Sequence, residues 1–326
     1  MSAAVDQTVR AAVALLAALA DDHPVHRRSE LLALGIPDAI QAAMVRRGAL
    51  IRLRHGVYSL RDVAAATAPM DRHRIDLAAA AAGAREPVWA FGLSAALTLS
   101  MPLPFAAPEH LALVRESGGD ERALTRASRH RLVIPDSRIT TGPVVVEATT
   151  MVRGVPVVGP ALAGVSAAAE LTSARWRTAL LDAALWQGTT TDEIRRLIDT
   201  WRHLGHRMEL LEALGRARPG AQTVLETFSR LALMERGLPE PVLQQAFYDE
   251  AGLIGYADMW WPGLRVIGEA DGAVKYASRA DIVKEKVRED RLRATGEAVV
   301  RWTFEEIEDD PDAVTARVLK AARRAA

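Results

Sequence analysis

Three carboxylates follow two apolar runs in one stretch near the C-terminal end of the sequence. Asp258 follows the run at 253–257, and Glu269 and Asp271 follow the run at 264–267, with Trp-Pro-Gly between the runs. Apolar runs on either side of such a turn predict a β-hairpin, and residues two apart on a strand point to one face. Acids gathered at strand ends repel one another unless protons, a basic side chain or a metal ion intervene. The stretch is therefore typical of a divalent-metal phosphodiesterase site.

Further charged residues could complete such a site. Lys275 lies just beyond the second predicted strand, and Glu226 lies on a helix upstream. The carboxylates of Asp258 and Glu269 offer oxygen atoms of the kind that Mg2+ prefers, and this ion keeps several waters. A bound Mg2+ would polarise a phosphoryl oxygen and lower the pKa of its water. These residues, together with Asp271, are the candidate catalytic set.

The alternative for the same acids is a structural network of ion pairs. Glu269 and Asp271 could pair with Lys275, Arg265 or Lys286, and acid runs are more often salt-linked than catalytic. Against this alternative, the predicted strand ends carry more acids than bases. Both interpretations remain open on the sequence alone.

The elements around these acids predict a mixed sheet with helices on its faces. The apolar periodicity gives a helix, three strands, a second helix and a fourth strand, at 221–235, 242–247, 253–258, 264–269, 278–294 and 298–303. Three antiparallel strands followed by a right-handed crossover to a fourth produce such a sheet. A last helix is expected at 313–325.

The N-terminal part predicts three helices followed by a basic hairpin. The helices are expected at 6–20, 27–34 and 38–47, with Asp38 as the N-cap of the third, and the hairpin strands at 50–54 and 57–60. This order is the winged variant of the helix-turn-helix, whose third helix enters a major groove while the hairpin contacts phosphate or the minor groove. The candidate DNA-binding residues are Gln41, Arg46, Arg47, Arg52, Arg54 and His55. The alternative is a packing module with solvated arginines.

Length and composition set limits on the rest of the chain. With 326 residues, two or three domains are expected, and we divide the sequence into a winged domain at 1–63, a mixed strand and helix domain at 64–217 and an α/β domain at 218–326. In the middle domain we expect strands at 111–114, 131–134, 144–147 and 155–158, and helices at 160–187 and 190–217, the first broken near Thr172. The fold class is therefore α+β and multidomain.

Charge and cysteine usage exclude several classes of function. The formal net charge is zero, so binding to nucleic acid would have to come from local patches. The sequence has no cysteine, which excludes disulfides and thiolate zinc sites and fits a cytoplasmic protein. No apolar stretch is long enough for a membrane span, so no membrane partner is expected.

Two segments resemble known families. The stretch 26–60, with its Gly-Ile-Pro turn, its Arg-Arg-Gly helix end and its Arg-His-Gly-Val-Tyr hairpin, resembles the N-terminal winged domain of AbiEi-type antitoxins, and Ser-Ala-Ala at 94–96 resembles the helix that follows it in that family. The resemblance implies a protein that binds double-stranded DNA, represses its own operon and opposes a nucleotidyltransferase toxin.

The C-terminal segment 218–302 resembles PD-(D/E)XK nuclease-like domains, and more narrowly those related to very-short-patch repair endonucleases. The matching stretches include Asp258-Met-Trp-Trp-Pro and Gly-Glu-Ala-Asp-Gly-Ala-Val-Lys-Tyr at 268–276. The resemblance implies that Asp258 and Glu269 bind Mg2+, but Asp271 occupies the position where the family pattern has lysine. Lys275 or Lys286 would then have to supply the basic group.

Two functions follow as expectations. The first is a DNA-binding transcriptional regulator of the antitoxin kind, with a nuclease-like domain that only binds. The alternative is a Mg2+-dependent DNA endonuclease that the winged domain directs to its target.

Overall fold

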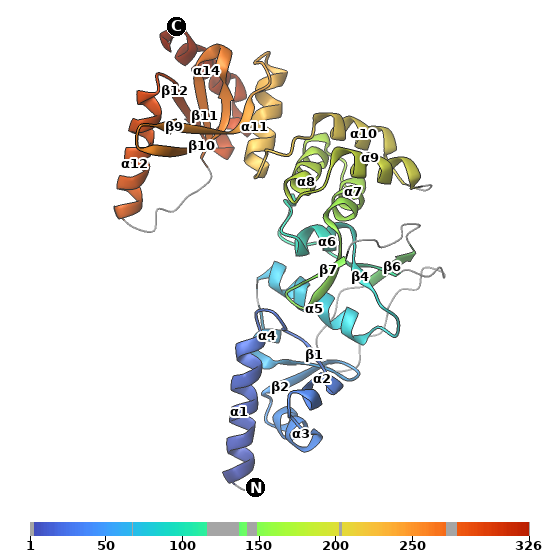
Figure 1. Ribbon diagram of the computed structural model, residues 1–326. Helices are drawn as coiled ribbons and strands as arrows, with labels where there is room; N and C mark the ends of the chain where they lie inside the picture. The colour runs from blue at the N-terminus through green and yellow to red at the C-terminus, as the bar shows by residue number, and fades with distance from the viewer. Residues whose placement is uncertain are drawn as a thin grey trace. The chain divides into compact units, whose positions relative to one another are not determined.

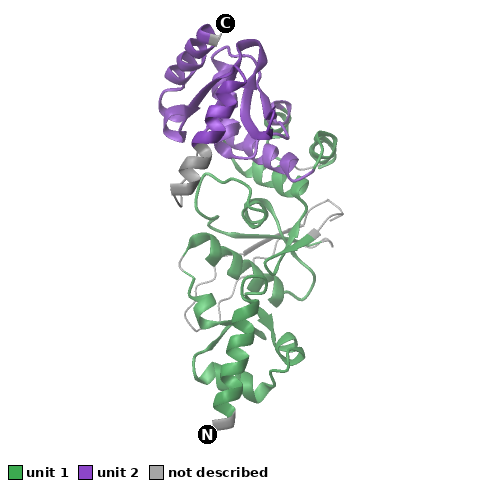
Figure 2. Ribbon diagram, turned by 60° about the vertical axis from the view of Figure 1, so that its left-hand side comes forward, with its two compact units in different colours: residues 1–172, 189–211 green, residues 173–188, 212–326 purple. Residues whose placement is uncertain are grey.

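The computed structural model describes residues 3–66, 68–115, 137–141, 149–201, 204–271 and 279–325. It is an α+β structure that divides into two compact units, as Figure 2 shows. One unit comprises residues 1–172 and 189–211, and the other comprises residues 173–188 and 212–326. The α+β, multidomain class predicted from the sequence is thereby confirmed. No helix among the described residues is long and apolar enough to cross a membrane.

The first unit begins with three helices and a small sheet, coloured blue in Figure 1. The helices are α1 (Ala3–Leu19), α2 (Arg28–Ala33) and α3 (Asp38–Arg46), and the strands are β1 (His26–Arg27), β2 (Leu50–Arg54) and β3 (Val57–Leu60). The sheet order is β1-β3-β2, and all pairs are antiparallel. Apolar residues at helical spacing on α1 and α3 meet the inner face of this sheet, and the largest fully buried side chains of this core are Leu16, Leu31, Met44 and Leu50.

The predicted N-cap of α3 is wrong by one residue. Pro37 is the N-cap, with an extended backbone, and Asp38 is the first helical residue. The Asp38 carboxylate forms an ion pair with Arg28 instead of capping the helix. Proline suits the start of a helix because its missing N–H would have no partner there.

The remainder of the first unit surrounds a five-stranded sheet of order β6-β5-β4-β8-β7. The strands are β4 (Trp89–Ala90), β5 (Leu111–Arg115), β6 (Ser137–Thr141), β7 (Thr149–Val152) and β8 (Val155–Val158). The helices of this part are α4 (Arg61–Ala64), α5 (Pro69–Gly83), α6 (Gly92–Thr98), α7 (Pro160–Glu170) and α9 (Thr191–Thr200). Two predicted strands, at 131–134 and 144–147, lie outside the described residues.

The second unit contains a four-stranded mixed sheet of order β12-β11-β10-β9. Its strands are β9 (Val242–Asp249), β10 (Gly252–Trp261), β11 (Val266–Ala270) and β12 (Ala298–Trp302). Strands β9, β10 and β11 are antiparallel neighbours, and β12 pairs in parallel with β11. The helices are α8 (Ala174–Trp186), α11 (Val224–Glu235), α12 (Arg279–Ala294), α13 (Phe304–Asp309) and α14 (Pro311–Ala325), while α10 (Arg207–Arg216) runs from the first unit into the second. The order from α11 to β12 is the one that the sequence predicts.

The two faces of this sheet carry separate cores. Val266 packs with residues of α8, α11 and α14, whereas its neighbour Ile267 packs with Leu292 of α12 on the other face. Adjacent strand residues point to opposite faces, so the continuous apolar run of β11 fills both cores. Helix α12 therefore lies over the face opposite to α11, and its Arg288 and Arg291 reach the neighbouring strands.

Helix α8 belongs to the C-terminal unit, although the sequence division into 1–63, 64–217 and 218–326 places it in the middle domain. Its Trp176 meets Phe228 of α11 edge to face, with ring centroids 5.1 Å apart, and Ala179 lies in the same core. The predicted break near Thr172 is confirmed, because α7 and α8 are separate helices. Both α7 and α8 are rich in apolar residues, so the sequence does not indicate which of the two cores each helix joins.

Candidate functional site

Four successive elements of the C-terminal sheet place polar side chains close together. Glu226 lies in the first turn of α11, Gln244 on β9, Asp258 on β10 and Glu269 on β11. We call these four residues and Arg288 of α12 the acid cluster. Burial raises the pKa of both Glu226 and Glu269, and the charge of Asp258 raises both further, so the three carboxyls lie within electrostatic reach of one another.

The sequence predicts all three acids at strand ends, but the structure places only some of them there. Asp258 lies inside β10, which continues to Trp261, and Asp271 follows the last residue of β11. The predicted strand was too short because Trp260 and Trp261 continue the alternation up to the Trp-Pro-Gly turn. Asp258 accepts a hydrogen bond from the backbone N–H of Ala270 at 2.8 Å, so it is tied to the neighbouring strand.

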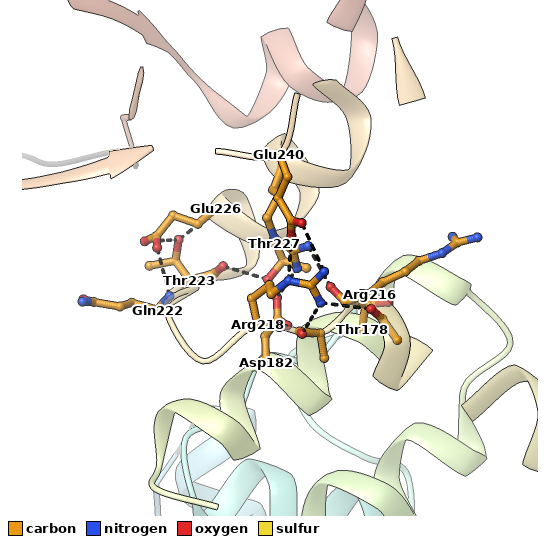
Figure 3. Close-up of polar contacts among 12 residues, drawn as sticks. Thr178, Asp182, Arg216, Arg218, Gln222, Thr223, Glu226, Thr227 and Glu240 are labelled. Atoms are coloured by element: carbon orange, nitrogen blue, oxygen red, sulfur yellow. Dashed lines mark hydrogen bonds and ion pairs between the residues drawn. The ribbon is translucent and has the colours of Figure 1, made fainter. Parts of the chain in front are cut away.

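Glu226 is buried and is held by its own helix start. Its carboxylate accepts hydrogen bonds from the backbone N–H of Gln222 and from the hydroxyl of Thr223, both at 2.9 Å, as the dashed lines in Figure 3 show. Thr223 is the N-cap of α11 and accepts the backbone N–H of Glu226 in return. This reciprocal arrangement fixes the side chain, and its structural role at the helix start accounts for part of its burial.

Gln244 joins Glu226 to Asp258. Its side-chain amide donates to Glu226 at 3.2 Å, and a hydrogen bond from the same side chain lowers the pKa of Asp258. Its backbone φ is 51°, in the left-handed region that residues other than glycine seldom adopt within a strand. Such strained positions gather at functional sites.

The basic group of the acid cluster is Arg288. Its Nη2 donates to Oε1 of Glu269 at 3.1 Å and to the carbonyl of Tyr256 at 2.8 Å, and its Nη1 lies 3.3 Å from Oε2 of Glu269. Lys286, one of the two predicted bases, is exposed on α12, and no ion pair between it and these acids is found among the described residues. Lys275, the other predicted base, lies outside the described residues.

Among the described residues, no hydrogen bond joins Asp271 to the acid cluster, although its charge adds to the effect of burial in raising the pKa of Asp258. Asp271 forms an ion pair with Arg301 of β12 at 3.3 Å, and its side chain is 45% exposed. Its backbone N–H donates to the carbonyl of Trp302, which continues the parallel β11–β12 ladder. The position that carries lysine in the resembled family is therefore taken by an acid that pairs with Arg301.

Burial dominates the electrostatics of the cluster. Loss of water raises the pKa of Glu226, of Asp258 and of Glu269, the last to about 7. The hydrogen bonds and positive charge of Arg288 lower the pKa of Glu269 but do not cancel the effect of burial. A cation at this place favours the ionised form of the three carboxyls.

The described residues do not fit a bound Mg2+ as they are arranged. Both oxygens of Glu269 face the guanidinium of Arg288, and one oxygen of Asp258 accepts a backbone N–H. No group of three or more histidine and acidic side chains within the described ranges is placed to hold a metal ion. Mg2+ needs near-octahedral oxygen ligands, and a guanidinium beside the ligand would repel it.

The candidate DNA-binding residues fall into two groups, and the first consists of one buried and one half-buried side chain. Gln41 is buried, and its amide donates to the carbonyl of Ile36 at 2.8 Å, so the prediction that it contacts DNA is corrected. Arg54 is half-buried, and its side chain lies against Gly83 of α5. Loss of water lowers the pKa of Arg54, and the charge of Asp76 raises it. These two polar residues face inward because the strand and helix faces that carry them pack on their neighbours.

The second group lies on the surface. Arg46 at the end of α3, Arg52 on β2 and His55 in the β2–β3 turn are exposed. The guanidinium of Arg52 lies 2.5 Å from Nδ1 of His55, so the two side chains stand together at the tip of the hairpin. Arg47 forms an ion pair with Asp6 of α1, which partly neutralises it.

The residues that the sequence did not single out are Gln244 and Arg288. Gln244 lies in a polar pair within β9, where side chains alternate, and nothing in the pattern distinguishes it from Gln245. Arg288 lies among several basic residues of α12, and the sequence predicts a lysine as the basic group beside the acids. Its position relative to Arg291, three residues later on the same helix face, is the only signal that could have suggested a common target.

Two curated proteins resemble this chain. Both are uncharacterised proteins of Mycobacterium tuberculosis, one from strain CDC 1551 / Oshkosh and one from strain ATCC 25618 / H37Rv. Each is 28% identical over 167 residues, which cover 51% of this chain and 61% of the relative. The chain thus spans about three fifths of the length of these relatives. No family model matches the sequence.

Proposed function

We propose that this protein is a DNA-binding transcriptional regulator resembling AbiEi-type antitoxins, in which the C-terminal nuclease-like domain contributes binding and not cleavage. The observation that carries the proposal is the exposure of Arg46 at the end of α3 and of the paired Arg52 and His55 on the β2–β3 hairpin. A three-helix arrangement with such a hairpin supports a winged helix-turn-helix.

In this interpretation α3 lies in a major groove, with Arg46 at its end beside the phosphates, and the hairpin tip contacts the neighbouring backbone. Arg52 and His55 would both reach the DNA there, because their side chains already stand together. With zero net charge over the chain, attraction to DNA would come from this local group. Phosphate contacts of this kind make binding strongly dependent on salt.

The test is the salt dependence of binding to a duplex that carries the promoter region of the protein's own gene. Substituting Arg46→Ala and Arg52→Ala together should weaken binding and lower the slope of log K against log salt by about one per phosphate contact removed. A matched control is Arg195→Ala with Arg196→Ala, which removes the same charge from exposed positions of α9 and should leave the slope unchanged. Unaltered binding by a folded Arg46/Arg52 variant would remove the proposal.

A Mg2+-dependent endonuclease is the second candidate. The convergence of Glu226, Asp258 and Glu269 from three elements favours it, whereas the contact between Arg288 and Glu269 does not. An endonuclease should nick DNA in the presence of Mg2+ or Mn2+, and Asp258→Asn or Glu269→Gln should abolish this nicking. The absence of cleavage of single-stranded, duplex and supercoiled DNA by folded protein would eliminate it.

The resemblance also implies a partner. An AbiEi-type antitoxin opposes a nucleotidyltransferase toxin, so we propose that this chain acts in the cytoplasm beside such an enzyme. A nucleotidyltransferase gene next to this one, and rescue of growth when the two are expressed together, would support the partnership.

A further inference from the structure

Arg288 is held in the acid cluster by more than one contact. The fork of its guanidinium faces both oxygens of Glu269, at 3.1 and 3.3 Å, and Nη2 also donates to the backbone carbonyl of Tyr256. Paired N–H donors match the geometry of a carboxylate better than a single donor does. The arginine is therefore oriented by the strand backbone as well as by the acid.

The backbone beside Arg288 leaves room for its side chain. A Cβ atom at Gly255 would lie 2.8 Å from Nε of Arg288, closer than such atoms approach in proteins. The φ of Gly255 is 156°, which other residues seldom adopt. Strand β10 thus has a residue without a side chain at the point where the arginine crosses it.

A second arginine fixes α12 on the same sheet. Arg291 donates from Nε and Nη2 to the two oxygens of Asp249, both at 2.6 Å, and Nη2 lies 3.3 Å from the carbonyl of Gly252. Arg288 and Arg291 are three residues apart and so lie on one face of the helix. This second contact, at the β9–β10 turn, keeps the helix in the register that delivers Arg288 to Glu269.

We propose that the guanidinium of Arg288 is the resident cation of the acid cluster and takes the place of a divalent metal there. The inference deepens the proposed function, and rests on it, because a cluster filled by the chain's own cation belongs to a domain that binds without cleaving. Arginine remains charged at every accessible pH, so it offsets the buried carboxylates permanently. A divalent ion would need the Glu269 oxygens that Arg288 uses and would stand beside a positive charge.

The substitution Arg288→Met tests this inference, because methionine keeps an unbranched chain of similar length but has no charge. The control Arg293→Met changes an exposed arginine of the same helix, with a side chain 58% exposed. Both proteins and the unchanged chain are titrated with Mn2+ alone, without DNA, by calorimetry and by electron paramagnetic resonance of the free ion. Circular dichroism verifies that each variant is folded.

The unchanged protein and Arg293→Met should take up no stoichiometric Mn2+, whereas Arg288→Met should bind one equivalent. Adding Glu269→Gln to Arg288→Met should weaken that binding by about 10–100-fold or more. Binding of one Mn2+ by the unchanged protein that Glu269→Gln abolishes would overturn the inference, and so would a folded Arg288→Met that binds none. Should Arg288→Met not fold, the titrations of the unchanged protein and of Glu269→Gln still decide it. Loss of DNA binding on Arg46→Ala with Arg52→Ala is a separate measurement, so failure of either proposal is distinguishable.

Discussion

Replacing Asp182 by asparagine should destabilise the C-terminal unit by about 3–5 kcal/mol. Asp182 of α8 and Arg230 of α11 form an ion pair at 3.0 Å, and each side chain is only 1% exposed. The Asp182 carboxylate also accepts the backbone N–H of Arg218 at 2.6 Å and the hydroxyl of Thr227 at 2.7 Å, as Figure 3 shows. Through these contacts it joins α8 to the segment between α10 and α11.

The magnitude follows from the charge that the substitution leaves behind. Asparagine has nearly the shape of aspartate but is neutral, and its NH2 group would face one of the present donors. Arg230 cannot lose its proton, so its charge would remain buried and uncompensated. Its Nη1 would keep only the carbonyl of Arg216, at 2.7 Å. Removing one partner of a buried pair is far more costly than replacing both with apolar groups.

The assay is urea unfolding at neutral pH, followed by tryptophan fluorescence, since five of the seven tryptophans lie in this unit. The control Asp290→Asn changes an exposed aspartate of α12 and should stay within about 0.5 kcal/mol of the unchanged protein. The double substitution Asp182→Leu with Arg230→Met should recover most of the loss, because it removes both charges. A loss below about 1 kcal/mol for Asp182→Asn would refute the reasoning.

Two further predictions concern single positions. Burial disfavours the imidazolium of His73 and lowers its pKa from the ordinary value of 6.5 to about 4. The contribution of His73 to stability is therefore present above pH 6.5 and is lost as the pH falls toward 4. This contribution is at most about 3 kcal/mol. In urea unfolding at several pH values, the free energy of unfolding of His73→Gln should depend less on pH than that of the unchanged protein. The control His206→Gln, at an exposed position, should keep the pH dependence of the unchanged protein. In the second unit, a Cβ at Gly268 would clash with the ring of Trp302, so Gly268→Ala should lower the free energy of unfolding by about 1–3 kcal/mol. Gly263→Ala, where a Cβ meets no atom within 4 Å, is its control and should leave the unfolding midpoint in place.

The elements with strong local signals could be predicted from the sequence. The capping box of α9 is one example, since Thr190 accepts the backbone N–H of Glu193 at 3.2 Å and the Glu193 side chain accepts that of Thr190 at 2.7 Å. The order of strands and helices from α11 to β12 was likewise predictable, because turns separate its apolar runs. The sequence predicts a last helix at 313–325, whereas a short additional helix, α13, precedes it on a second capping box with Glu306.

The candidate site was less accessible to prediction, because it depends on contacts between distant residues. The sequence indicated Asp258 and Glu269, but not that Arg288 would reach Glu269 across 19 positions of chain. It also placed Gln41 on a binding face, although the amide of Gln41 satisfies the carbonyl of Ile36 inside the N-terminal core. Side-chain type predicts which chemistry a residue can perform, whereas burial decides whether it is available.

The acid cluster destabilises the fold, and this destabilisation indicates that the cluster has a role other than packing. Burial raises the pKa of Glu226, Asp258 and Glu269, so each carboxyl is less stable when ionised than it would be in water. Apolar residues in place of a buried ion pair are often neutral or stabilising, so packing alone does not require the cluster. Gln244 adds a strained backbone at the same place. The combination of buried acids, local strain and a fitted arginine therefore favours a site shaped for an ionic contact over one shaped for stability.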